Sequence, residues 1–237
     1  VLLLHDWPHA TRLRAAATAD SRPSGRSGRL LWLALPMGLV MLLDSLNQNV
    51  PRYLLEWTGG TSELGIYVAM AYVIQLGGTV VFALGTPLAT AMARDYAELR
   101  GASFTRRAVG LLVITAGFGV AGVAFAWLAG EPFLRLVYSE QFAAHDVFVW
   151  VMVGAGLQYL VLTCNNVLTT TRRLRIQALL WAATLAATTA SAWALVPVRG
   201  ILGAAQAFAL GMAVGALLAG VAVAVVVRNV RRKEPQI

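Results

Sequence analysis

Six stretches of about 20 mainly apolar residues follow one another along the chain, separated by short segments where polar and charged residues gather. Their limits are 30–50, 64–86, 108–129, 146–168, 176–196 and 200–227. An apolar helix of about 20 residues can cross the roughly 30 Å hydrocarbon core of a bilayer. The pattern therefore predicts an all-α, polytopic membrane protein with a six-helix transmembrane bundle.

The outer part of the first stretch, Leu39–Trp57, breaks this apolar pattern. Asp44, Asn47 and Gln48 are spaced i, i+3 and i+4, so they project from one side of a helix. Polar and ionisable side chains are costly inside a bilayer and normally face a bundle interior or a water-filled cavity. The spacing predicts a polar path through the membrane along this side of the helix.

Pro51 and Arg52 come directly after these residues. Pro51 lacks the N–H that would bond the carbonyl of Asn47, which leaves that acceptor free. A charge such as that of Arg52 costs roughly 2.5–3.5 kcal/mol at membrane depth, and its planar guanidinium suits a phosphate group. In the alternative interpretation, Asp44 and Arg52 pair with each other or with lipid headgroups at the outer interface.

Polar residues also interrupt the second and fourth stretches. Gln75 lies in the second, and Gln158 and Asn165 lie seven residues apart on one side of the fourth. Hydrogen bonding between helices explains such residues without any ligand. The candidate residues along the substrate path are Asp44, Asn47, Asn49, Arg52, Gln75, Gln158 and Asn165.

Small residues recur at helical spacing in the last two stretches. Gly211 and Gly215 form a GxxxG pair, and four alanines lie four residues apart, namely Ala182, Ala186, Ala190 and Ala194. Small residues let helix backbones approach closely. Both sets predict helix-packing surfaces.

The charge distribution sets a membrane orientation. The chain is 58% hydrophobic and 13% charged with a formal net charge of +8, and its cations cluster in alternate connecting segments. With a cytoplasmic N-terminus, 16 of the 19 Lys and Arg lie inside, and only Arg52, Arg135 and Arg199 lie outside. Inner loops carry an excess of Lys and Arg, so both termini are predicted to be cytoplasmic. This placement argues for a membrane protein and against a nucleic-acid partner.

Three segments organise the chain. Residues 1–28 are predicted to be a cytoplasmic linker, residues 29–228 the six-span transmembrane lobe, and residues 229–237 a basic cytoplasmic tail. The chain starts with Val rather than Met, and the VLLL that opens it is typical of the end of a preceding span. We therefore expect a further, N-terminal lobe to cover the polar surface of the first span.

Motifs for metal or covalent chemistry are missing from the sequence. Cys164 is the single cysteine, and His5 and His9 have no further ligand close by in sequence. No combination of Ser, Cys, His and Asp lies at a depth suited to nucleophilic catalysis. We expect neither a metal, a cofactor nor an enzyme activity, and in particular not a membrane-embedded sugar-phosphate enzyme.

A resemblance adds to this interpretation. Residues 49–72, NVPRYLLEWTGGTSELGIYVAMAY, resemble polysaccharide-biosynthesis transporters of the Wzx type in the pattern N-x-P-R-Y, Glu, E-L-G-I-Y-x-A-x-x-Y. Milder likeness continues from Pro87 to Phe104, around Tyr138, and from Val196 to Ala205. Those proteins belong to the multidrug/oligosaccharidyl-lipid/polysaccharide exporter superfamily, with two lobes around a central cavity. The resemblance implies the C-terminal lobe of an alternating-access flippase for undecaprenyl-diphosphate-linked oligosaccharide in the bacterial inner membrane.

The expected partners are accordingly the lipid-linked oligosaccharide, membrane lipids and the N-terminal lobe. Under the resemblance, Arg52 pairs with the substrate diphosphate or with Glu56, while Asp44, Asn47 and Gln75 line the path. A second interpretation is a cation-coupled multidrug exporter lobe of the same superfamily, with Asp44 in the coupling. A third is a membrane-embedded structural or partner subunit with no transport of its own.

Overall fold

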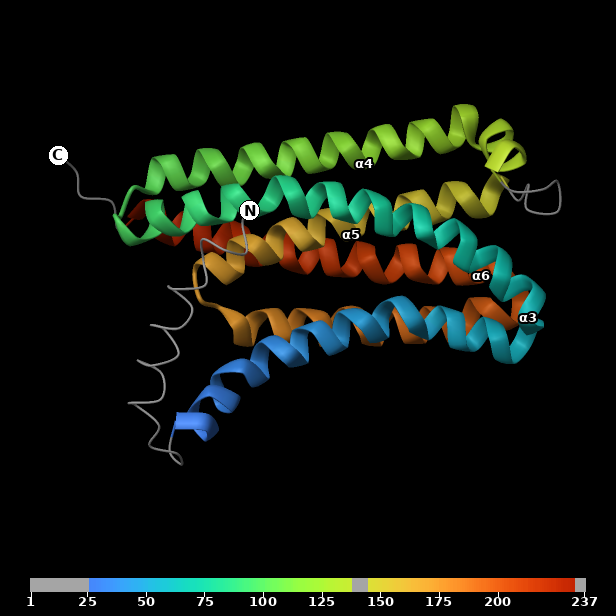
Figure 1. The fold of residues 1–237 in the computed structure, drawn as a ribbon, viewed down its shortest axis with the longest axis horizontal. Helices are drawn as coiled ribbons and strands as arrows, with labels where there is room; N and C mark the ends of the chain where they lie inside the picture. Colours follow the sequence, from blue (N-terminus) through green and yellow to red (C-terminus); the bar gives the residue numbers. More distant parts are fainter. Residues whose placement is uncertain (1–25, 138–144, 233–237) are drawn as a thin grey trace, which may run out of the picture. The chain divides into compact units, whose positions relative to one another are not determined.

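The computed structural model describes residues 26–137 and 145–232, and almost all of them are helical (Figure 1). Four helices follow in order: α3 (Arg26–Ala97), α4 (Gly101–Val137), α5 (His145–Thr170) and α6 (Leu174–Arg232). Only residues 98–100 and 171–173 lie outside a helix within the described ranges. The predicted all-α class is confirmed.

The described residues contain four helical stretches that are long and apolar enough to cross a membrane. They are Ser62–Ala97, Gly101–Leu136, His145–Thr170 and Leu174–Arg231. The part of α3 before Ser62 is not among them, so the count of six spans stays a prediction. Within the described ranges, residues 26–38 belong to a different unit from the residues that follow, and all contacts described below lie among residues from Leu39 onward.

Helices α3 and α6 each consist of two helices joined at a glycine. Gly60 has φ 77° and ψ −177°, and Gly200 has φ 52° and ψ −130°. Residues that carry a Cβ rarely adopt these backbone conformations. The chain reverses direction at both points (Figure 1). The reversal at Gly60 falls between the predicted stretches 30–50 and 64–86, and that at Gly200 falls at the start of the predicted stretch 200–227.

The two hairpin turns at the opposite end share a single geometry. Leu99 (φ 56°) follows α3 and Arg172 (φ 58°) follows α5, and both are left-handed. The N–H of Arg100 donates to the carbonyl of Asp95 at 2.9 Å, and that of Arg173 to Leu168 at 3.0 Å. These bonds are the usual way to end a helix. Leu99 takes the left-handed position, and Gly101 begins α4.

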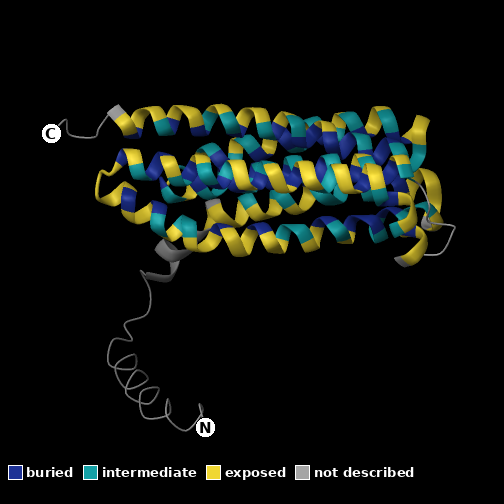
Figure 2. Ribbon diagram, turned by 90° about the horizontal axis from the view of Figure 1, so that it is seen from above, coloured by how far each residue is buried: buried dark blue, intermediate teal, exposed yellow. Residues whose placement is uncertain are grey.

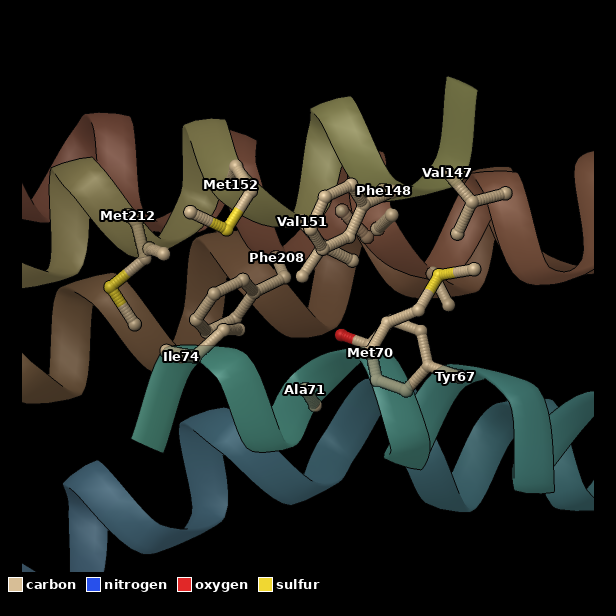
Figure 3. Close-up of a cluster of buried hydrophobic side chains, with 14 of the residues drawn as sticks. Tyr67, Met70, Ala71, Ile74, Val147, Phe148, Val151, Met152, Phe208 and Met212 are labelled. Atoms are coloured by element: carbon tan, nitrogen blue, oxygen red, sulfur yellow. The ribbon is translucent and has the colours of Figure 1, made fainter. Parts of the chain in front are cut away.

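The core lies where α5 packs between its neighbours. Side chains from α3, α5 and α6 meet in one buried cluster (Figure 3), which includes Tyr67, Met70, Phe148, Met152 and Phe208. A second cluster near the hairpin turns joins all four helices, with Met92, Phe104, Leu111, Val167 and Val223 among its members. Buried and exposed residues follow one another closely along the visible helices (Figure 2).

Glycines allow three close helix contacts. Gly119 of α4 lies directly against Gly156 of α5, so a Cβ on Gly119 would come within 2.9 Å of the Gly156 Cα. Within α6, Gly211 contacts Thr188, and Gly215 contacts Thr184. The packing surface predicted for the GxxxG pair is confirmed.

The alanine stripe of α6 does not pack against any of the described residues. Ala182, Ala186, Ala190 and Ala194 are all exposed, whereas Thr184, Thr188 and Ala192 are buried. The two parts of α6 can approach closely when only one of them carries small residues, and Gly211 and Gly215 are those residues. The threonines therefore form the opposing surface, and among the described residues the prediction for the alanines is wrong.

Candidate functional site

A polar cavity of about 290 Å³ opens between the two parts of α3 and α5. Its polar lining comes from Asp44 and Gln48 on the first part of α3, Gln75 and Thr79 on the second part, and Gln158 and Tyr159 on α5. Ile74, Gly78, Phe82 and Leu162 complete the wall. Three residues predicted for the substrate path, Asp44, Gln75 and Gln158, thus line one cavity.

Asp44 is the charged group of this cavity. Its carboxylate accepts a hydrogen bond of 3.2 Å from the Gln48 side-chain amide, and the Gln158 amide lies close enough to interact with it as well. The cavity lining contains no Lys or Arg. A carboxylate held by neutral amides keeps acceptor capacity for sugar hydroxyls, amines or a cation.

Tyr159 closes one side of the cavity. Its hydroxyl donates to the backbone carbonyl of Ile74 at 2.8 Å, and its ring lies against Gly77 and Gly78. A Cβ on Gly77 would collide with the Tyr159 hydroxyl, so glycine at this position lets the ring approach the helix. Beside it, Gln158 is 4% exposed and its Oε1 has no hydrogen-bond partner among the described residues.

Asn47 lies outside the cavity, although it was predicted to share a side of the helix with Asp44. It is fully buried, and neither side-chain polar atom has a partner in the described part of the chain. At 3.6 residues per turn, Gln48 lies roughly 40° to one side of Asp44, whereas Asn47 lies roughly 60° to the other. A cavity on one side of Asp44 therefore includes Gln48 and omits Asn47.

Asn49 and Arg52 form a separate polar group farther along α3. The Arg52 guanidinium donates to Asn49 Oδ1 at 3.3 Å, and the Asn49 amide donates to the Ser45 carbonyl at 2.8 Å. Arg52 Nε is buried without a partner, and the described residues place no carboxylate in ion-pair contact with this side chain. A pair between Arg52 and Asp44, or between Arg52 and Glu56, is absent from this arrangement.

Asn165 lies toward the other end of α5, away from the cavity lining. Its backbone carbonyl accepts a 2.7 Å hydrogen bond from the Gln177 side chain of α6, which also donates to Thr169 Oγ1 at 2.7 Å. The Asn165 Oδ1 is buried without a partner among the described residues. This residue belongs to the contact between α5 and α6.

The list of candidate residues omitted three polar members of the cavity, Gln48, Thr79 and Tyr159, although Gln48 had been placed on the polar side of its helix. A tyrosine in the middle of an apolar span, next to Gln158, was a usable signal. Within residues 26–137 and 145–232, no group of three His, Cys, Asp or Glu side chains could hold a metal ion.

Comparisons with known proteins bear on this arrangement. No family model matches the chain. A curated relative, the capsular polysaccharide biosynthesis protein CapF of Staphylococcus aureus, is 23% identical over 129 residues, which cover 54% of this chain and 32% of that protein.

Two solved structures share the fold. An outward-facing multidrug resistance MATE family transporter of the MOP superfamily matches with a TM-score of 0.76 and 15% identity, covering 90% of this chain and 49% of that one. A point mutant of a MATE protein matches with a TM-score of 0.77 and 16% identity over the same shares. The chain spans about half the length of these structures, and a smaller part of CapF.

The fold is therefore that of a multi-pass helical membrane protein. More specifically, it is the helical arrangement found in MATE transporters of the MOP superfamily. The long apolar helices of the chain fit this class.

Proposed function

We propose that the chain is the C-terminal lobe of a flippase that moves an undecaprenyl-diphosphate-linked oligosaccharide across the bacterial inner membrane. The observation that carries the proposal is the Asp44 cavity, a polar space within an otherwise apolar bundle. The likeness to a capsular polysaccharide biosynthesis protein favours a sugar-containing substrate.

The chemistry of the cavity suits the sugar part of such a substrate. Asp44, Gln48, Gln75 and Gln158 offer carboxylate and amide groups that match sugar hydroxyls, which both donate and accept hydrogen bonds. The negative charge of Asp44 disfavours a diphosphate at the same place. The cation of Arg52 lies eight residues farther along α3, or roughly 12 Å at 1.5 Å per residue, and suits the diphosphate as it reaches the outer side.

The topology that goes with this function has six crossings. A continuous helix of the 59 residues of α6 would be roughly 90 Å long, about three times the hydrocarbon core. Division at Gly60 and Gly200 gives segments of the right length, with both termini in the cytoplasm. The exposed side of the lobe then receives an N-terminal lobe, which completes the cavity.

Asp44 also favours a second candidate function, a cation-coupled multidrug exporter lobe. A half-buried carboxylate in a cavity without Lys or Arg is suited to binding a cationic drug or a coupling ion. The first of the two solved structures is a multidrug resistance transporter.

Reconstitution distinguishes the two functions. The chain, expressed in its native reading frame with any upstream lobe, is placed in proteoliposomes that contain a fluorescent undecaprenyl-diphosphate-linked oligosaccharide. We expect the wild-type protein to flip this substrate. Gln158→Leu should lower flipping strongly, whereas Asn165→Leu, outside the cavity, should leave it nearly unchanged. Efflux of a cationic dye in a sodium or proton gradient, with no flipping, would establish the exporter instead.

A further inference from the structure

The Tyr159 side chain separates two cavities of opposite character. On one side lies the polar cavity of about 290 Å³ around Asp44. On the other side lies an apolar groove of about 430 Å³ between the second part of α3, α4 and α5. Tyr159 lines both, and a single residue thus forms a shared wall between them.

The groove opens toward the apolar surface of the helices. Its lining includes Leu76, Val80 and Phe125, whose side chains are exposed by 71%, 46% and 43%. Phe118 packs against the Tyr159 ring with the centroids 5.7 Å apart. In a membrane, such exposed apolar side chains contact lipid hydrocarbon.

The shared wall is one side chain thick. The Tyr159 hydroxyl makes a single hydrogen bond to the Ile74 carbonyl, a contact worth roughly 0.5–1.5 kcal/mol net. Gly77 and Gly78 face the ring without side chains of their own. At this point of the contact between α3 and α5, only the Tyr159 side chain stands between the two cavities.

A lipid-linked substrate imposes a geometric requirement on any cavity that accepts its head. The hydrocarbon chain stays in the apolar phase because exposure to water costs about 0.8 kcal/mol per methylene group. The polar head needs the groups around Asp44. The cavity must therefore communicate sideways with the hydrocarbon of the bilayer.

We propose that the apolar groove holds the hydrocarbon chain of the lipid-linked substrate while its head enters the Asp44 cavity, with the linkage passing the α3–α5 contact at Tyr159. This inference rests on the proposed function. A chain that enters from the bilayer gains little hydrophobic free energy, so the groove contributes position rather than affinity. Tyr159 is then a positioning residue between chain and head.

A second apolar groove serves as an internal control. It lies on the other side of the Gly119–Gly156 contact, is lined by Ala116, Val120, Ala124 and Trp127 among others, and measures about 460 Å³. Both grooves share Gly119 and Gly156, but neither Tyr159 nor any other residue of the polar cavity lines this one. Contiguity with the polar cavity, not size, thus distinguishes the proposed site.

The test fills each groove in turn. Ala121→Trp adds an indole to the groove beside Tyr159, and Ala124→Trp adds the same group, one helical turn away, to the control groove. Both alanines are exposed, so the substitutions disturb the core little. We expect Ala121→Trp to lower flipping of the lipid-linked probe about tenfold, equivalent to about 1.4 kcal/mol, and Ala124→Trp to leave it nearly unchanged.

Photolabelling of the wild-type chain gives an independent measurement. An undecaprenyl-diphosphate disaccharide with a diazirine on its first isoprene unit should label peptides containing Leu76 or Tyr159. A diazirine farther along the chain should label those containing Ala121 or Phe125. A phosphatidylglycerol with an acyl diazirine reports bulk lipid in the same groove, and the lipid-linked compound should displace it.

The outcomes separate this inference from the proposed function. Equal flipping by both tryptophan variants, or equal labelling of both grooves, would overturn the groove assignment while the flippase function stands. Phospholipid labelling that the lipid-linked compound cannot displace would also overturn it. If the wild-type protein showed no flipping and no labelling, that result would contradict the flippase function itself.

Discussion

The Asp95 carboxylate lies 2.8 Å from Nε of Arg107, across the turn that joins α3 to α4. The Asp95 side chain is 4% exposed, whereas that of Arg107 is 40% exposed. The two side chains form an ion pair but not a well-aligned hydrogen bond. Neither Asp95 Oδ2 nor Arg107 Nε has a hydrogen-bond partner among the described residues. Two residues before Arg107, Thr105 Oγ1 accepts a hydrogen bond of 3.3 Å from Arg231 of α6, which connects the start of α4 to the end of α6.

This asymmetry predicts unequal effects of the two single substitutions. Arg107→Ala leaves a buried carboxylate without its cation and should cost about 3 kcal/mol, at the lower end for buried pairs because Arg107 is partly exposed. Asp95→Asn leaves only a half-exposed cation and should cost less. Thermal unfolding in detergent checks the order, with Glu98→Gln in the exposed Arg100–Glu98 pair as a control expected to cost less than about 1 kcal/mol. Equal losses at Asp95 and Arg107 would contradict the argument.

A second prediction concerns the close contact inside α6. A Cβ on Gly211 would overlap the Thr188 side chain and lie 2.9 Å from the Thr188 Cα. Gly211→Ala should therefore lower the thermal unfolding temperature clearly, and adding Thr188→Ala should restore only part of it, because the backbone remains in the way. Gly220 has no atom within 4 Å of its Cβ position, so Gly220→Ala should be neutral or slightly stabilising. A harmless Gly211→Ala would refute this helix contact.

The apolar pattern predicted much of the fold, because a long apolar stretch in a bilayer forms a membrane-spanning helix. It located the reversals near Gly60 and Gly200, where the spans had to end. It did not predict which side of each helix packs. The Ala182–Ala194 stripe and the Gly211–Gly215 pair both consist of small residues, and the sequence does not show that the glycines pack against Thr184 and Thr188 while the alanines stay exposed.

The candidate site was predicted in part for a similar reason. Polarity within an apolar span singled out Asp44, Gln75 and Gln158, which line one cavity. These three residues come together only because α3 packs against α5. The spacing of residues within one helix does not predict which helices pack against each other. Tyr159 escaped notice because an aromatic residue in an apolar span is usually core, and its role depends on Gly77 of another helix segment.

Membrane orientation gives a third prediction. In a Cys164→Ala background, single cysteines at Ser62 and Val198 should react with an impermeant thiol reagent added from outside, and one at Glu98 only after lysis. All three side chains are exposed. The reverse labelling pattern would invert the topology.

Gly60 itself is a poor labelling position. It has φ 77° and ψ −177°, a conformation essentially confined to glycine, so any other residue there should cost about 1–3 kcal/mol. Ser62, two residues later in the regular helix, reports the same side of the membrane without that strain.

Arg52 supplies the last prediction, since its local contacts are too few to account for a cation at this depth. It donates to Asn49 at 3.3 Å, and its buried Nε has no partner among the described residues. A residue present for stability would be paired more fully, so Arg52→Ala should change the unfolding temperature little. If Arg52 receives the substrate diphosphate, the same variant should lose about 1.5–3 kcal/mol of charge-assisted hydrogen bonding and lower flipping at least about tenfold.

Two further variants separate the shape of the Arg52 guanidinium from its charge. Arg52→Lys should restore only part of the activity, because an ammonium keeps the charge but lacks the two-pronged geometry. Arg135, which is exposed and paired with Glu131 at 2.6 Å, provides the matched control, and Arg135→Ala should flip normally. Normal flipping by Arg52→Ala at equal protein level would exclude the diphosphate role, whereas a large loss of thermal stability would show that Arg52 serves the fold.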